Sequence, residues 1–343
     1  MSVLGRAGGG INWAIGAVAV LVLVAVPYVT DQFQTFMFAQ VAAYAVAVVG
    51  LNILTGYSGQ ISLGNGAFMA IGSYVTALLT ARAGWSPYLT IPLGGLLAGF
   101  VGVLVGIPAL RLRGIYLALA TFALALSVTP VLNNYDRFTG GHLGVGFKAV
   151  TPPFDIPLSN EQWLYLLGWI VFLLLFVPSW LLLRGRTGRA WMAVRDSETA
   201  AAANGISLAY YKTLAFGISA FYAGVAGSLL VIDFAYVNPD SYSLNLSLQL
   251  LVAMVIGGLA NIWGPLFGAL LVVWLPYVAE KAVNSKPDLA FGALLIVVVF
   301  LAPNGIAGLL RRGLLMLRGR RQEAVAMTGA LEATPAEADQ IAT

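Results

Sequence analysis

Charge is the scarcest property of this sequence. Only 9% of its 343 residues are Asp, Glu, Lys or Arg, whereas 59% are hydrophobic, and the mean hydropathy is +0.87. A soluble domain carries roughly 25% charged residues because its surface faces water. The composition therefore excludes most soluble enzymes and predicts a polytopic membrane protein. The formal charge of +4 does not indicate nucleic-acid binding, because the basic residues form short runs between apolar stretches.

Several chemically active side chains are also rare or missing. The chain has no cysteine, which excludes disulfides, thiolate metal sites and cysteine nucleophiles. Its one histidine, His142, is expected to be a loop residue, and a single histidine excludes a multi-histidine zinc site. No lysine follows a glycine, so the chain has no P-loop and is not expected to bind nucleotide that way. We find no paired catalytic residues and expect no metal site.

Ten apolar stretches approach the length of about 20 residues that a helix needs to cross a bilayer. They lie near residues 11–29, 33–54, 61–81, 88–110, 114–133, 162–183, 213–232, 244–260, 263–279 and 289–310. The eighth and ninth are short and meet at residues 257–265, so they form either two tilted spans or one broken, re-entrant element. The first stretch follows Arg6 as in a signal peptide, but its length favours a retained span.

The basic residues predict the orientation. With a cytoplasmic N-terminus, 13 of the 18 Lys and Arg residues lie in cytoplasmic segments, which favours both termini inside and an even number of spans. Residues 244–279 then count as two crossings. We expect an all-α polytopic membrane protein of about ten transmembrane helices. The transmembrane domain covers 1–317, with a cytoplasmic loop at 184–212 and a periplasmic loop at 134–161, and a mobile cytoplasmic tail covers 318–343.

The predicted spans contain no Lys, Arg, Asp or Glu. Ionisable groups in a membrane usually mark proton relays or ion sites, so this absence argues against proton coupling, and less strongly against sodium coupling. Small and polar residues cluster instead where the second span turns into the third. The candidate pathway residues are Asn52, Gly56, Tyr57, Ser58, Gly59, Gln60, Ser62 and Asn65. They either satisfy one another at a helix contact or line a path for a polar solute.

The 184–212 loop has the start and stop signals of helices. Thr187 is a candidate cap for a first helix. Asp196 or Ser197 is a candidate cap for a second, which residues 204–205 would end. An alanine run gives this second helix high propensity without side-chain bulk. Such a helix suits a groove on a partner protein; alternatively, the loop is a surface connector whose arginines meet anionic lipid.

Residues 51–68, LNILTGYSGQISLGNGAF, resemble the signature of branched-chain amino acid ABC transporter permeases of the LivM type. Further stretches agree in the same order, and the resemblance covers roughly residues 35–310. These stretches are 113–118, 139–144, 257–265 and 300–309. Residues 195–205 resemble the EAA-type coupling loop of ABC importer permeases. Asn65-Gly66 and Asp196-Ser197 depart from the commonest residues of the family, and the first departure bears on pathway polarity or substrate range.

The resemblance implies a permease subunit of an ATP-driven bacterial importer in the inner membrane. It would form half of the pathway for branched-chain or other hydrophobic amino acids. Its implied partners are a second permease of the LivH type, two ABC ATPase subunits that hold ATP and Mg²⁺, a periplasmic substrate-binding protein, and membrane lipid. The residues implied to couple it to an ATPase are Arg195, Asp196, Glu198, Ala200, Ala201 and Gly205. The chain itself would be no enzyme and would bind no cofactor.

Three other classes of protein are compatible with a long apolar chain. A stand-alone secondary transporter would work without an ATPase and would normally need an ion-binding acidic or unwound site. A membrane-embedded enzyme would need catalytic residues paired at one membrane depth. A passive channel would be formed by the small, polar cluster between the second and third spans.

Overall fold

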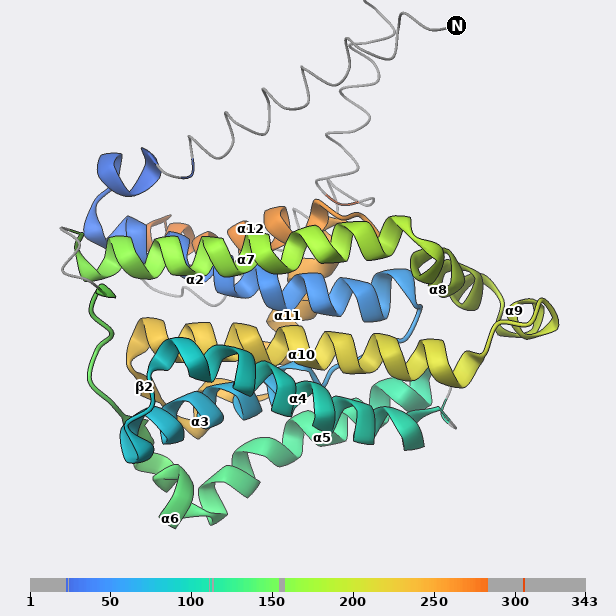
Figure 1. The fold of residues 1–343 in the computed structure, drawn as a ribbon, viewed down its shortest axis with the longest axis horizontal. Coiled ribbons are helices and arrows are strands. Elements are labelled where there is room, and N and C mark those ends of the chain that lie inside the picture. Colours follow the sequence, from blue (N-terminus) through green and yellow to red (C-terminus); the bar gives the residue numbers. More distant parts are fainter. Residues whose placement is uncertain are drawn as a thin grey trace, which may run out of the picture.

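The computed structural model describes residues 23, 25–110, 112, 114–153, 158–282 and 305. Within these ranges the chain consists mainly of α-helices that run side by side (Figure 1). The predicted span at 289–310 and the tail at 318–343 lie outside the described residues, apart from Gly305, and so does most of the span at 11–29.

Each of the eight predicted spans between residues 33 and 279 corresponds to one helix. Among the described residues, five helical segments are long and apolar enough to cross a membrane. They are α2 with its continuation η1 (Gln32–Leu51 and Asn52–Tyr57), α4 (Pro87–Ala109), α5 (Ile115–Asn134), α7 (Asn160–Arg184) and α10 (Leu208–Phe234). The other elements are α3 (Asn65–Ala83), α6 (Asp136–Thr139), η2 (Gly141–Leu143), β1 (Val145–Gly146), α8 (Arg186–Asp196), α9 (Glu198–Ala203), β2 (Tyr236–Val237), η4 (Pro239–Tyr242), α11 (Leu244–Gly257) and α12 (Gly264–Ala282).

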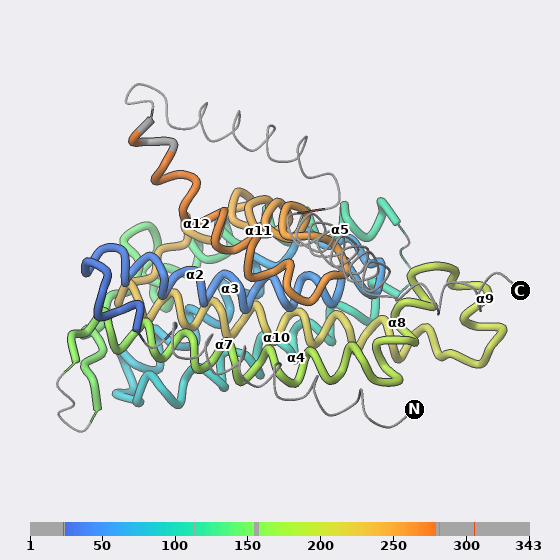
Figure 2. The backbone as a smooth tube through the Cα atoms, turned by 90° about the horizontal axis from the view of Figure 1, so that it is seen from above, coloured from blue at the N-terminus to red at the C-terminus, as the bar shows by residue number. Residues whose placement is uncertain are grey.

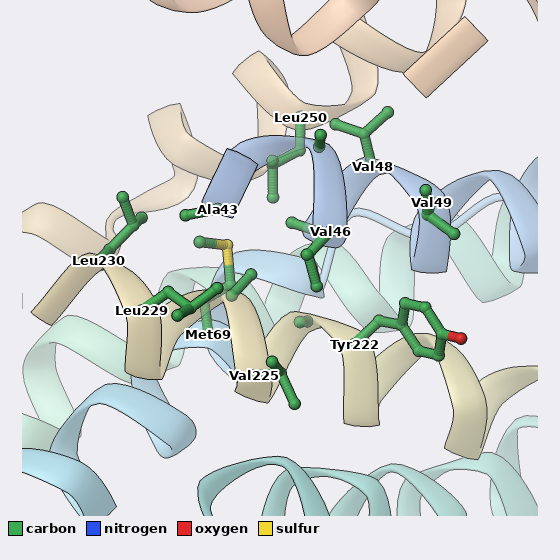
Figure 3. Packing of buried hydrophobic residues seen from close by; sticks show 14 of the residues in the cluster. Ala43, Val46, Val48, Val49, Met69, Tyr222, Val225, Leu229, Leu230 and Leu250 are labelled. Atoms are coloured by element: carbon green, nitrogen blue, oxygen red, sulfur yellow. The ribbon is translucent and has the colours of Figure 1, made fainter. Parts of the chain in front are cut away.

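Helix α10 is the centre of the bundle. It packs against α4, α3 and α2, and α2 in turn packs against α7 and α12. Figure 3 shows Val46 of α2, Met69 of α3 and Leu229 of α10 gathered between these helices. In the most apolar stretch of α10, 89% of the residues are buried, against 17% in that of α5. α5 therefore lies at the edge of the bundle, with most of its apolar side chains partly or fully exposed.

Glycines let the central helices approach closely. A Cβ at Gly72 of α3 would overlap the carbonyl oxygen of Gly224 on α10, and one at Gly227 would overlap that of Met69. On α4, a Cβ at Gly102 would overlap the side chain of Ala220. Small residues at such contacts let backbones pack directly, which is how helices associate in a membrane, where apolar surface alone gives no preference for a neighbouring helix.

Residues 244–279 fold into helices α11 and α12. They are two separate helices that pack along each other (Figure 2). A Cβ at Gly257 would overlap the carbonyl oxygen of Gly264, so the two helix ends meet backbone to backbone. The turn between them contains Gly258 and Ala260, both with positive φ (118° and 53°).

The segment with His142 lies at the end of the bundle opposite α8 and α9 (Figure 1). As expected, His142 is outside the long helices, in η2. Gly144 has φ +65°, and a Cβ there would overlap the carbonyl oxygen of Val237. The glycine permits β1 to pair antiparallel with β2, with Val145 opposite Val237.

Candidate functional site

The polar segment, residues 52–66, begins with an irregular helix. Helix α2 continues as a π-helix over Asn52–Tyr57, where the Ser58 amide donates to the carbonyl of Ile53 at 3.1 Å. The chain then leaves the helix through Gly59 at φ +73° and begins α3 at Asn65. A π-helical turn is rare and frequently lies at a functional site.

Asn52 binds the α11–α12 turn. Its side-chain amide donates to the carbonyl of Asn261 at 2.9 Å and accepts from the amide of Ala260 at 3.0 Å. Ala260 has a positive φ, and Asn52 holds it there. A Cβ at Gly56 would lie 2.8 Å from the same Ala260 nitrogen, so Gly56 leaves the space for this turn.

Gln60 binds the start of α10. Its side-chain amide donates to Ser58 Oγ at 2.7 Å and to the carbonyl of Lys212 at 3.2 Å. The Thr55 hydroxyl donates to the Gln60 carbonyl at 2.9 Å. The irregular stretch after the π-helix is thereby satisfied by its own polar side chains, as buried backbone groups require.

The beginning of α3 is tied to two further helices. The Asn65 side chain lies 3.4 Å from Ser219 Oγ on α10, and the Gly66 amide donates to Ser247 Oγ on α11 at 3.0 Å. The Ser62 hydroxyl accepts from the Gly64 amide at 3.3 Å.

The structure therefore brings the eight candidate pathway residues together, mostly in buried positions. Tyr57 is half-buried and Gly59 exposed; the buried members are Asn52, Gly56, Ser58, Gln60, Ser62 and Asn65. The Asn52, Gln60 and Asn65 side chains bind neighbouring elements of the same chain.

The 184–212 loop contains the two expected short helices, α8 and α9, and its last residues, 208–212, form the start of α10. Ser197 caps α9 by accepting from the Ala200 amide at 3.3 Å, as predicted, and Gly205 at φ +78° follows its end. The predicted cap Thr187 was wrong: α8 begins earlier, with Gly185 at the cap position. A Cβ at Gly188 would overlap the Leu183 carbonyl, so the joint between α7 and α8 is too tight for a later start.

Trp191 anchors α8 on the bundle. Its side chain is fully buried, and its indole N–H donates to the carbonyl of Tyr211 on α10 at 2.8 Å. A buried indole needs such a partner. The bond fixes α8 relative to the first turn of α10.

Arg195 joins the loop to the polar segment. Its guanidinium donates to the carbonyl of Gly56 at 3.0 Å and pairs with Asp196 at 3.1 Å. A Cβ at Gly59 would lie 2.7 Å from Arg195 Cγ, so glycine permits this approach. Arg195 thus contacts the end of the π-helix directly.

Glu198 is a third link between the loop and the bundle. Its carboxylate pairs with the Lys212 ammonium at 2.5 Å, and the Lys212 side chain is only 7% exposed. On α9, Ala201 is buried, while Ala200, Ala202 and Ala203 are exposed, as is Gly205 after the helix. The outward surface of α9 is consequently formed by small side chains.

A polar cavity of about 220 Å³ lies where the loop meets the polar segment. Ser58, Gly59 and Gln60 line it from one side, and Arg195 and Lys212 from the other. Asp196 and Glu198 also line it, so two cations face two carboxylates. Polar segment and loop form one site, which we call the coupling site.

The hydropathy pattern did not place Lys212 and Asp233 within a helix. The predicted span 213–232 is longer in the structure: α10 covers Leu208–Phe234 and so includes Lys212 at one end and Asp233 at the other. The Ser207 hydroxyl accepts from the Tyr210 amide and caps α10 ahead of the apolar run. A Ser immediately before Leu208 was the available signal.

Apolar helices, a buried polar joint and a helical loop fixed at one end of the bundle define a multi-pass membrane protein with a candidate docking element. The chain belongs to the family described as "Branched-chain amino acid transport system / permease component", whose model matches residues 33–302.

Known relatives agree with this assignment. The chain is 32% identical to the high-affinity branched-chain amino acid transport system permease protein LivM of Escherichia coli K12, over 88% of this chain and 76% of the relative. It is 28% identical to the permease protein LivH of the same organism, over 78% and 92%. It is 29% identical to the autoinducer 2 import system permease protein LsrC of Klebsiella pneumoniae, over 68% and 62%. No solved structure shows a significant match.

Proposed function

We propose that the chain is the membrane-spanning permease subunit of an ATP-driven ABC importer of the bacterial inner membrane. It forms half of the translocation pathway for branched-chain or other hydrophobic amino acids. The contact of Arg195 with Gly56 supports this function most directly, because it joins the candidate docking loop to the segment where α2 turns into α3.

Movement of an ATPase would enter the chain at α9. The exposed face of this helix carries Ala200, Ala202 and Ala203, which suits a shallow groove on a partner. Glu198, through its pair with Lys212, holds α9 on α10 rather than reaching into the groove. Gly205 ends the docking helix.

The movement would continue from α8 into the polar segment. Trp191 makes α8 follow the first turn of α10, and Arg195 makes the polar segment follow α8. Asn52 passes the displacement to the α11–α12 turn. A π-helix and a left-handed glycine can absorb such a change locally, while the close-packed helices on either side move as rigid elements.

The remaining parts of the importer are separate chains. The proposed partners are a second permease of the LivH type, two ABC ATPase subunits that bind ATP and Mg²⁺, and a periplasmic substrate-binding protein. The exposed apolar side chains of α4, α5 and α7 would face lipid or the second permease.

Isolation of the full chain from its native membrane in mild detergent tests this function. We expect an ABC ATPase and a second permease to come with it, and the assembly to hydrolyse ATP faster when binding protein loaded with leucine, isoleucine or valine is added. Recovery as a homo-oligomer alone, under conditions that preserve a known ABC importer, would contradict the proposal and favour a secondary transporter. Solute flux that is independent of ATP would favour a channel.

A further inference from the structure

A second cavity, of about 420 Å³, lies at the end of α10 opposite the 184–212 loop. It is formed by α2, the end of α10, β2, η4 and the start of α11. Four aromatic and three aliphatic side chains line it, together with one asparagine and one serine. Its volume falls within the range of about 300–1,000 Å³ that is usual for small-molecule sites.

Three polar groups of this cavity have hydrogen-bonding capacity to spare. The hydroxyls of Tyr44 and Ser241 make no hydrogen bond within the part of the chain that the structure describes. Asn238 uses its side-chain oxygen to accept from the Asp240 amide at 2.9 Å, which leaves its NH₂ group unused. Ser241 is exposed and Asn238 half-buried, so these groups can bind either water or a polar ligand that enters the cavity.

The wall of the cavity carries no net charge. None of its lining residues is acidic or basic. Tyr242 is 5% exposed, and burial raises the pKa of its phenol above the ordinary value of 10.0, so the phenol stays neutral. A solute with net charge would be desolvated here without compensation, whereas one that carries balanced charges and an apolar group fits.

We infer that this cavity receives a zwitterionic amino acid with an aliphatic side chain. Leu230, Val237 and Leu246 offer apolar contact to that side chain. Asn238 and Ser241 offer hydrogen bonds to its charged ammonium and carboxylate groups. The inference rests on the proposed function and adds the site at which the permease holds the solute.

The cavity and the coupling site share their two central helices. Tyr44 and Leu230 line the cavity from α2 and α10, and Lys212 lies on the coupling site 18 residues before Leu230. At 1.5 Å per residue this separation is about 27 Å, close to the thickness of a bilayer core. Displacement of α10 at the coupling site therefore reaches the wall of the cavity through one continuous helix.

Cysteine labelling tests the inference, because the chain has no native cysteine. Ser241→Cys places a thiol on the cavity. Ser86→Cys is the matched control: Ser86 is exposed at the start of α4, at the same end of the bundle, outside the cavity. The purified importer that contains either variant is treated with a maleimide, without ATP, in the presence of leucine or arginine.

We expect leucine at about four times its Kd to slow alkylation of Ser241→Cys about fivefold. At that concentration about 80% of the sites are occupied, so only about one fifth of the cysteines remain accessible to the maleimide. Arginine leaves this rate unchanged, and neither solute affects Ser86→Cys. Unchanged labelling of Ser241→Cys in leucine would overturn the inference. Equal slowing of both cysteines would also overturn it, because it would indicate a general change of conformation.

Transport kinetics provide an independent test. Asn238→Asp keeps the acceptor for the Asp240 amide but replaces the NH₂ donor by a negative charge, so we expect the KM for leucine to rise about tenfold. Asn160→Asp adds the same charge to an exposed position at the start of α7 and serves as the control. An unchanged KM in Asn238→Asp, with normal leucine uptake by the wild type, would refute the cavity assignment alone. Failure of the wild type to take up any aliphatic amino acid would refute the proposed function.

Discussion

The ion pair between Glu198 and Lys212 holds α9 against the bundle, and its two members differ in exposure. The Lys212 side chain is 7% exposed and that of Glu198 is 28% exposed. Glu198→Gln would leave an ammonium group buried without its carboxylate. Loss of one partner costs about 3–5 kcal/mol in a fully buried pair and about 0–1 kcal/mol at the surface, so we expect about 2 kcal/mol here.

Lys212→Met has a smaller expected effect. The methionine keeps most of the apolar stem, and the Glu198 side chain that remains is more exposed than that of Lys212, so we expect a smaller cost of about 1 kcal/mol. The double variant Glu198→Gln/Lys212→Met buries no unpaired charge. Its cost should be close to that of Lys212→Met alone, well below the sum of the two single changes.

The alkylation rate of a single introduced cysteine measures the free energy for opening of the loop. Ala201 is 4% exposed, so alkylation of Ala201→Cys reports how often α9 leaves the bundle. We expect about 30-fold faster alkylation with Glu198→Gln and about fivefold with Lys212→Met. Two results would refute the structural role assigned to the pair. One is an acceleration of alkylation in the double variant equal to the product of the accelerations in the two single variants. The other is no acceleration with Glu198→Gln.

Two further predictions concern packing and the polar segment. Gly72→Ala should destabilise the protein by about 3 kcal/mol or more, because its Cβ overlaps the Gly224 carbonyl, whereas Gly106→Ala, 3.2 Å from the Phe216 side chain, should cost less than about 1 kcal/mol. Equal melting temperatures in detergent would contradict this. Asn52→Leu leaves a donor and an acceptor of the α11–α12 turn unpaired and should cost about 3 kcal/mol. A melting temperature equal to that of the wild type would show that water replaces the amide.

The long helices were predictable because their signal is local. A run of about 20 apolar residues has few alternatives to a membrane span, and this holds from α2 to α10. The start and end of α9 were also predictable, because Ser197 and Gly205 act on the backbone next to them. The prediction that Thr187 caps α8 was wrong because a tertiary contact, the tight packing of Gly188 against the preceding helix, fixed the start of α8.

The coupling site was only partly predictable. Hydropathy is the same for an α-helix and a π-helix, so the irregular turn at Asn52–Tyr57 left no signal in the apolar pattern. The partner of Asn52 lies 209 residues further along the chain. Lys212 was assigned to a loop, so its pair with Glu198 could not be expected. The sequence pattern identified polar groups at this corner, and the fold decided which of them bind one another.

The central claim is that ATPase movement reaches the polar segment through Arg195. The double variant Gly59→Cys/Arg195→Cys tests it most directly, because a Cβ at Gly59 would lie 3.1 Å from that of Arg195, close enough for a reversible disulfide after a small adjustment. Reduced, the variant lacks the guanidinium link and should hydrolyse ATP with little uptake. Oxidised, it should recover at least about tenfold more uptake per ATP, since the covalent bond replaces the link. Equal uptake in the two redox states would contradict the claim.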